Sequence, residues 1–356
     1  MKKQRPDTVA ASLLCVAAGL ALGFLVLVVI EPSKALTAFV TMLQNFFYFP
    51  RADVALEYFG STLVRTAPLA LCAVSVIYAR NAGLFNIGAS GQFTAGAMAA
   101  LLSGIGCHMP WWICLPAAIL AGGIAGAAAG ALKAYCGVNE VISGIMINWI
   151  LLYAANTALT SFTDSNTYTL DLSVNEPGAV LPSLGLDRLF SGNDTVTVAI
   201  VLTPLLAVLA KFVLERTRLG FETRSVGLNP SAAQLSGMFE RQNVIITMFL
   251  AGAFSGAAAG FLYLSGAETW RCSATVVPQI GFDAIAAAYL GGLDPYGALI
   301  ASYFITHIQM GSLHMDKMAY PQEVASLVIA VTIYTSAFAA FLRQLLSGKR
   351  KKGAAV

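Results

Sequence analysis

The chain has 356 residues, of which 57% are hydrophobic and 11% are charged, and its formal net charge is +3. Its mean hydropathy is +0.73. Soluble domains carry about 25% charged residues, so this composition excludes a surface that faces water over most of the chain. It also excludes disorder, a coiled coil and a disulfide scaffold. The sequence therefore predicts an all-α polytopic membrane protein.

About ten transmembrane helices are expected, because a helix needs roughly 20 apolar residues to cross a bilayer. The candidate segments are residues 8–30, 60–79, 92–106, 111–132, 141–159, 194–214, 243–265, 280–292, 297–311 and 322–342. Three of them, 92–106, 280–292 and 297–311, are short. Short spans are typical of broken or re-entrant helices that lie inside the protein.

Positive charges predict the orientation. Lys2 and Lys3 precede an apolar run of about 23 residues, too long for the core of a signal peptide, so we expect a retained first helix. With the N-terminus inside, ten spans also place the C-terminus inside. Most of the 21 Lys and Arg residues then fall on inner segments, including the basic tail 349–352, as the positive-inside rule requires.

The hydropathy pattern also predicts an inverted-topology repeat. Residues 60–159 and 243–342 each contain four apolar runs, and they start an odd number of spans apart, so they enter the membrane in opposite directions. The expected regions are an N-terminal helix and outer loop (1–59), a first repeat (60–159), an outer loop with a linking helix and an inner loop (160–242), a second repeat (243–342) and a basic tail (343–356).

Small residues form two stripes at helical spacing, which favours close packing of helix backbones. The stripes are Gly122, Gly126 and Gly130 in one run, and Gly252, Gly256 and Gly260 in another. Cys107 and Cys114 flank a short turn and could form a disulfide, but small apolar thiols are the interpretation we favour.

Motifs of enzymes are missing from the sequence. Gly348-Lys349 is followed by Arg350, so it is not the Ser- or Thr-terminated phosphate loop of an ATPase. The three histidines have no spacing that suggests a metal. We expect a chain that is not an enzyme and binds no cofactor or metal itself.

Polar residues within or beside apolar runs are candidates for a path through the membrane. We single out Asn86, Gly88, Gln92, Asn148 and Asp283. Amides suit a neutral solute that forms hydrogen bonds, but hydrogen bonding between helices explains them as well. A mutual pair of Asp283 with Arg65, which also lies in a span, is a further hypothesis.

Two loops differ from plain connectors. The inner loop 215–242 contains Asn229, a good N-cap, followed by Pro230 at the first helical position and Gly237 as a stop. A short capped helix on a basic loop indicates a docking element for an inner partner. The outer loop 160–193 is acidic, and it fits a docking face for an external protein and a solvated connection equally well.

Two longer motifs resemble the permease subunits of bacterial ABC importers in the family that serves branched-chain amino acids, ribose and nucleosides. Residues 80–96 read RNAGLFNIGASGQFTAG, and residues 281–297 read GFDAIAAAYLGGLDPYG. Residues 138–148, VNEVISGIMIN, are similar to the nucleoside-type branch, and residues 226–233, VGLNPSAA, to the ATPase-coupling segment. The resemblance covers residues 60–342. Ala89-Ser90 departs from it, since an acidic residue is expected near Ser90.

The resemblance implies a subunit that forms the translocation path and couples to separate cytoplasmic ATPase subunits, which use the ATP. It also implies a second permease, a shorter paralogue of this longer one, an external solute-binding lipoprotein, and a location in the bacterial inner membrane. The coupling residues it points to are Arg224, Gly227, Asn229, Pro230, Ala233 and Gly237.

Nucleosides are the solutes that the resemblance favours. Riboflavin, a simple sugar or another polar metabolite remains an alternative within the same class of importer. An ion-coupled secondary transporter is the alternative from another class, and it would keep the repeat but need no ATPase-docking loop.

Overall fold

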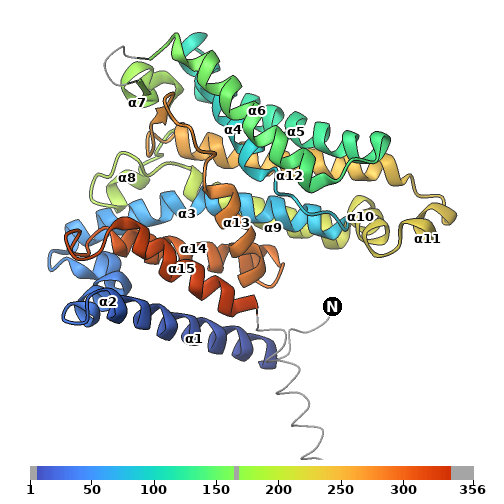
Figure 1. Cartoon of the computed structure of the whole chain (residues 1–356). Coiled ribbons are helices and arrows are strands. Elements are labelled where there is room, and N and C mark those ends of the chain that lie inside the picture. The colour runs from blue at the N-terminus through green and yellow to red at the C-terminus, as the bar shows by residue number, and fades with distance from the viewer. Residues whose placement is uncertain (1–5, 164–167, 338–356) are drawn as a thin grey trace, which may run out of the picture. The chain divides into compact units, whose positions relative to one another are not determined.

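The computed structural model of the chain describes residues 6–163 and 168–337. Helices dominate this part of the chain (Figure 1). Its strands are β1 (Thr169–Leu170) and β2 (Trp270–Arg271), which pair antiparallel, with Leu170 opposite Trp270. The all-α class predicted from composition is confirmed.

A helix lies at each of the ten segments predicted to cross the membrane. These helices are α1 (Pro6–Ile30), α3 (Ala52–Asn81), α4 (Ala89–Leu101), α5 (Trp111–Cys136), α6 (Glu140–Thr160), α9 (Ala199–Arg216), α12 (Glu240–Tyr263), α13 (Ile280–Leu290), α14 (Pro295–Ser312) and α15 (Gln322–Ala337). Within the described residues, α3, α5, α6 and α12 are long and apolar enough to cross a membrane by length and composition. The predicted basic tail 343–356 lies outside the described residues.

Short helices form the connections. They are α2 (Ala35–Gln44), η1 (Asn45–Tyr48), η2 (Leu102–Gly106), α7 (Leu172–Asn175), η3 (Pro177–Ala179), α8 (Leu186–Leu189), α10 (Arg218–Leu228) and α11 (Pro230–Leu235). Three of them, α7, η3 and α8, belong to the acidic outer loop, so the described part of that loop is ordered.

Backbone contacts divide the described residues into two compact units, one from the part before residue 56 together with the part after residue 303, and one from residues 56–303. In the first unit α1 packs against α15, where Gly23 faces the side chain of Val328. The Tyr320 hydroxyl donates a hydrogen bond of 2.7 Å to the carbonyl of Glu31. The division into five regions with an inverted repeat stays a prediction.

In the second unit α4, α5, α6 and α12 pack side by side (Figure 1). The two glycine stripes meet there. A Cβ atom on Gly252 would overlap the carbonyl oxygen of Gly122, and one on Gly126 would overlap the carbonyl oxygen of Met248. The backbones of α5 and α12 therefore touch, which confirms that the stripes are packing surfaces.

Helix α4 is short and almost entirely buried, as predicted for a broken helix. It ends earlier than residue 106, because residues 102–106 form a π-helical turn. Such turns insert one extra residue and redirect the chain.

The described cysteines are free thiols. Cys114 is buried and its thiol donates to the carbonyl of Met109 at 3.2 Å, whereas Cys107 is exposed. The side chain of Cys15 lies outside the described part. The hypothesis of a bond between Cys107 and Cys114 is therefore wrong for this structure, as the preferred interpretation expected.

The contact of α5 with α12 can be tested by its effect on thermal stability. Gly252→Ala places a methyl group against a backbone carbonyl that cannot rotate away, and overpacking of this kind costs about 1–3 kcal/mol. We expect a lower midpoint of thermal unfolding for the purified chain in detergent. Gly178→Ala is the control, because a Cβ there meets its nearest neighbour at an ordinary 3.6 Å. Equal midpoints for the two variants would contradict the contact.

Candidate functional site

The sequence around Asn229 folds as its cap signals predict. The Asn229 side chain accepts a hydrogen bond of 3.1 Å from the backbone N–H of Ala232, and Pro230 occupies the first turn of α11. After α11, Gly237 has a φ of +80°, which ends the helix. Helices α10 and α11 with their flanks, residues 217–239, are called the α10–α11 segment below.

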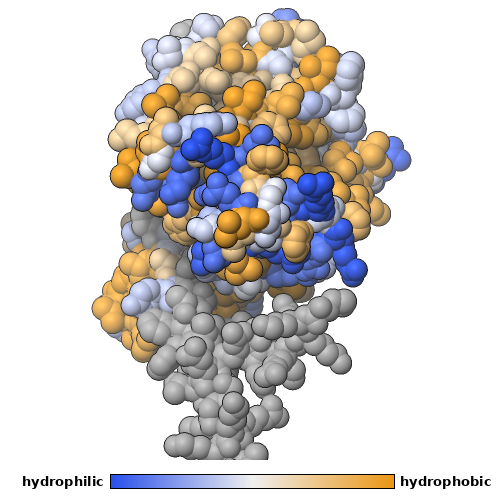
Figure 2. Space-filling view, turned by 90° about the vertical axis from the view of Figure 1, so that its right-hand side faces the viewer, coloured by the Kyte–Doolittle hydropathy of each residue, from blue (hydrophilic) through white to orange (hydrophobic). Residues whose placement is uncertain are grey.

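The α10–α11 segment exposes large apolar side chains. Leu235 is 92% exposed, Leu228 87% and Phe239 73%, on a segment that also carries Arg218 and Arg224. Figure 2 looks onto this end of the second unit, where hydrophilic residues gather with hydrophobic ones among them. Apolar side chains held out on a charged surface indicate a binding surface for another protein.

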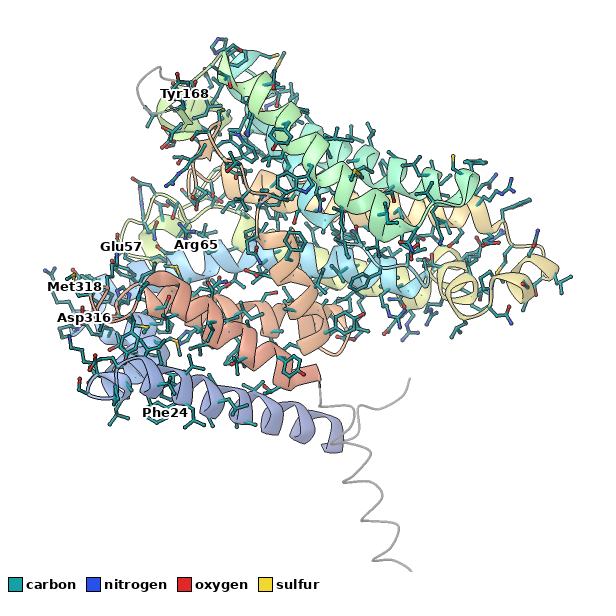
Figure 3. All side chains as sticks on the ribbon, in the orientation of Figure 1. Phe24, Glu57, Arg65, Tyr168, Asp316 and Met318 are labelled. Atoms are coloured by element: carbon teal, nitrogen blue, oxygen red, sulfur yellow. The ribbon has the colours of Figure 1, made fainter. Side chains whose placement is uncertain are left out.

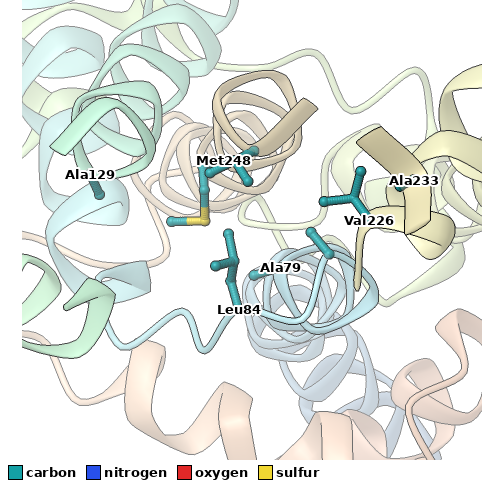
Figure 4. Close-up of a cluster of buried hydrophobic side chains, with 8 residues drawn as sticks. Ala79, Leu84, Ala129, Val226, Ala233 and Met248 are labelled. Atoms are coloured by element: carbon teal, nitrogen blue, oxygen red, sulfur yellow. The ribbon is translucent and has the colours of Figure 1, made fainter. Parts of the chain in front are cut away.

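The other face of the same segment packs against the end of α3 and the residues that follow it. Ala233 is 4% exposed and belongs to a buried cluster with Val226, Leu84 and Met248 (Figure 4). Arg224 folds back on its own helix, with its Nε donating to the carbonyl of Gly220 at 3.2 Å.

The close contact between α10 and the end of α3 requires a glycine at residue 227. A Cβ atom there would overlap the carbonyl oxygen of Asn81 and lie 2.8 Å from the carbonyl carbon of Ala82. Its partner Gly83 has a φ of +77°, a left-handed conformation that favours glycine. The backbone of α10 can touch the end of α3 here only because residue 227 has no side chain.

A pocket of about 410 Å³ lies beside this contact. Its walls come from the chain after α3, from α10 and α11, and from the adjoining ends of α5, α6 and α12. Lys133 and Glu140 form an ion pair of 2.9 Å on its wall. The Arg241 guanidinium, also on the wall, lies 5.7 Å from the ring of Tyr135. Sequence reasoning missed this pocket, because its charged residues looked like ordinary inner-side cations and loop acids.

The second part of the site is a buried group of polar side chains around the start of α4. Asn86 donates to Ser75 Oγ at 3.0 Å and to Gln92 Oε1 at 2.8 Å, and Gln92 donates back to Asn86 Oδ1 at 3.1 Å. Asn148 of α6 accepts the N–H of Gly91 at 2.7 Å and donates to the carbonyl of Ile87 at 3.1 Å. We call Ser75, Asn86, Gln92 and Asn148 the amide cluster.

Four of the five predicted path residues therefore lie together. Gly88 lies beside the amide cluster, because a Cβ atom on it would lie 3.3 Å from Asn86 Oδ1 and 3.4 Å from Gln92 Nε2. Asp283, in the first turn of α13, accepts a hydrogen bond of 3.3 Å from Gln279. The hydrogen bonds join α3, α6 and the start of α4, and whether these residues touch a solute stays a prediction.

Arg65 pairs with Glu268 at 3.0 Å, not with Asp283. Figure 3 labels Arg65 on α3. The hypothesis of an Arg65–Asp283 pair is wrong, because Glu268 follows the end of α12 and brings a carboxylate to Arg65 from residues that the apolar runs did not single out.

Comparisons with known proteins agree with this arrangement. Residues 58–337 match the family described as branched-chain amino acid transport system / permease component. The chain is 34% identical to the guanosine ABC transporter permease protein NupP of Bacillus subtilis (strain 168), over 83% of this chain and 86% of that protein.

Two further relatives match over similar lengths. The chain is 30% identical to the nucleoside ABC transporter permease protein NupB of Lactococcus lactis, over 77% of this chain and 78% of that protein. It is 32% identical to the glucose ABC transporter permease protein TsgB13 of Haloferax volcanii, over 77% and 75%. The chain belongs to this family of multi-pass membrane permeases.

The cap of α11 can be tested directly. Asn229→Ala removes the side-chain acceptor, and loss of such a cap costs about 1 kcal/mol of helix stability. We expect the amides of residues 231–235 to exchange hydrogen about fivefold faster. The control is Ser231→Ala, which removes an exposed hydroxyl from the same helix. An unchanged exchange rate in Asn229→Ala would show that the cap does not hold α11.

Proposed function

We propose that this member of the family is a permease subunit of an ABC importer for nucleosides in the bacterial cytoplasmic membrane. Its N- and C-termini face the cytoplasm, and its partners are two cytoplasmic ATPase subunits, a second and shorter permease, and an external solute-binding lipoprotein. ATP binds to the ATPase subunits, since the sequence of this chain has no phosphate-binding loop.

The observation that carries the proposal is the two-faced α10–α11 segment. One face presents Leu228 and Leu235 to the surroundings, and the other is fixed to the end of α3 through Gly227 and Ala233. An ATPase that docks on the first face can transmit its movement through the second. Arg224, Asn229, Pro230 and Gly237 maintain the shape of this element.

The features of the outer loop favour the docking of an external protein. Val174, Leu184 and Leu189 are exposed on its short helices and turns, among the acidic residues of the loop. The loop is held in place by the β1–β2 pair and by a hydrogen bond of 2.8 Å from Leu181 N–H to the carbonyl of Leu264. An ordered surface of this kind suits docking better than a solvated connection does.

The solute assignment rests on the relatives and on the chemistry of the interior. Guanosine and nucleosides appear in the names of two relatives, and glucose in the name of the third. The amide cluster carries no formal charge, which suits a neutral solute rich in hydrogen-bonding groups. A sugar is therefore the second candidate, and the comparisons contain no support for an ion-coupled carrier.

The docking of an ATPase can be tested with the tagged chain in its native host. Leu235→Glu puts a charge into the proposed apolar contact and should reduce the co-purified ATPase by about tenfold or more. Leu184→Glu is the matched control, since Leu184 is 75% exposed on the outer loop. Equal recovery of ATPase with both variants would refute the docking face.

Uptake by cells with the gene deleted and restored tests the solute. We expect the uptake of labelled guanosine and other nucleosides to fall to a small fraction on deletion and to recover on restoration. Uptake of riboflavin, ribose and glucose should not change. Loss of glucose uptake alone would agree with an ABC importer but would contradict nucleosides as its solute.

A further inference from the structure

The chain from α3 to α4 turns at the exposed Gly83 and then runs back into the unit. Residues 82–88, called the break segment, start with backbone hydrogen bonds from Ala82, Gly83 and Leu84 back to the last turn of α3. Asn86 then bonds to Ser75, six residues before the end of α3 and so about 9 Å back along it. The break segment thus runs inward, alongside α3.

Helix α4 starts at a similar depth along α6. Gly91 bonds to Asn148, which lies eight residues, or about 12 Å, beyond the first residue of α6. The first turn of α4 is therefore inside the unit, and the break segment carries backbone groups to that depth. The amide cluster satisfies part of them, as an apolar interior demands.

A second broken helix starts at the same place. Helix α13 begins at Ile280, and the backbone of Gly281 lies on Ser90, with a built Cβ only 2.7 Å from Ser90 Cα. Ser90 itself is completely buried. The first turns of α4 and α13 thus meet, N-terminus to N-terminus. Two helix ends with the same partial positive charge repel each other, so packing from elsewhere must hold this junction.

The other end of the break segment is held by the α10–α11 segment. Leu84 is buried in the cluster with Val226 and Ala233 (Figure 4), and Gly83 touches Gly227. One short stretch of chain therefore joins the α10–α11 segment to the α4–α13 junction. Every contact along it lies within the second compact unit.

The packing around the break segment favours movement there. Helices α5 and α12 interlock through backbone contacts at their glycines, so a shift of one past the other meets immediate overlap. The pocket of about 410 Å³, in contrast, borders Ala82, Gly83 and Leu84 on one side and α10 and α11 on the other. Residues beside this space can change position without displacing a packed core.

We propose that the break segment transmits displacement of α11 to the junction of α4 and α13, and that Leu84 and Gly281 are positioning residues at its two ends. The inference rests on the proposed docking of an ATPase on α11. Movement of α11 shifts Leu84 through Val226 and Ala233, the break segment follows, and the first turns of the two broken helices separate or close. No residue of this link has to touch the solute.

Hydrogen exchange in the complete importer tests the link. The complex that co-purifies with the tagged chain is placed in lipid nanodiscs and compared without nucleotide and with ATP plus orthovanadate. We expect exchange to change by about threefold or more, both in residues 225–237 and in residues 82–91. A change confined to residues 225–237 would overturn the inference.

Variants show whether Leu84 carries the effect. Leu84→Ala should keep the nucleotide-dependent change in residues 225–237 and lose it in residues 82–91. Val226→Ala shortens another side chain of the same buried cluster and should give the same result, which covers the case of a Leu84 variant that does not fold. The control is Leu159→Ala, a fully buried leucine near the far end of α6, which should keep both changes.

The outcomes separate the two proposals. If no ATPase co-purifies with the unchanged chain, the proposed docking fails and the inference fails with it. If the complex assembles and Leu84→Ala keeps both changes, only the proposed link through the break segment is wrong.

Discussion

A helix interrupted inside an apolar protein must satisfy the backbone groups that the interruption leaves without partners, because no bulk water reaches them. This constraint explains the surroundings of the break segment. Asn148 accepts the Gly91 N–H and donates to the carbonyl of Ile87, so a single side chain serves both sides of the start of α4. The reciprocal bonds between Asn86 and Gln92 fix the chain between them.

Neighbouring helices can cover such an interruption because their backbones pack closely against it. Gly144 brings α6 against Gly88, and Gly281 brings α13 against Ser90. At the other end Gly227 brings α10 against Asn81. Because each of these glycines lacks a side chain, the two backbones at its position come into direct contact. The α10–α11 segment, with its exposed apolar side chains, thereby contacts the chain that leads to the buried start of α4, so the proposed coupling needs no long-range mechanism.

Sequence patterns predicted the features that depend on local chemistry. Hydropathy located the ten helices, and the order Asn229, Pro230 and Gly237 predicted a short capped helix that the structure contains. The glycine stripes were recognisable as packing surfaces from their spacing. These signals succeed because each is determined within one or two helical turns.

Features that depend on distant residues were not predictable in the same way. The spacing of Gly122 and Gly252 does not say that these two stripes meet each other, and the hydropathy of the chain does not place Glu268 next to Arg65. The amide cluster joins residues of three helices and the loop before α4. Asn86, Gln92 and Asn148 could be named as polar residues in or beside apolar runs, but their assembly and the part of Ser75 in it could not be predicted. The pocket was invisible for the same reason, since it is a space between six segments.

The central claim is that the α10–α11 segment remains fixed to the end of α3 while it acts on the start of α4. Cryo-electron microscopy of the native assembly, without nucleotide and with ATP plus orthovanadate, measures this most directly. The account predicts that α11 lies in a groove of the ATPase and that Gly227 touches Asn81 in both states, while residues 82–91 differ between them. An α11 that contacts no ATPase, or a Gly227 that separates from Asn81 while residues 82–91 stay unchanged, would contradict it.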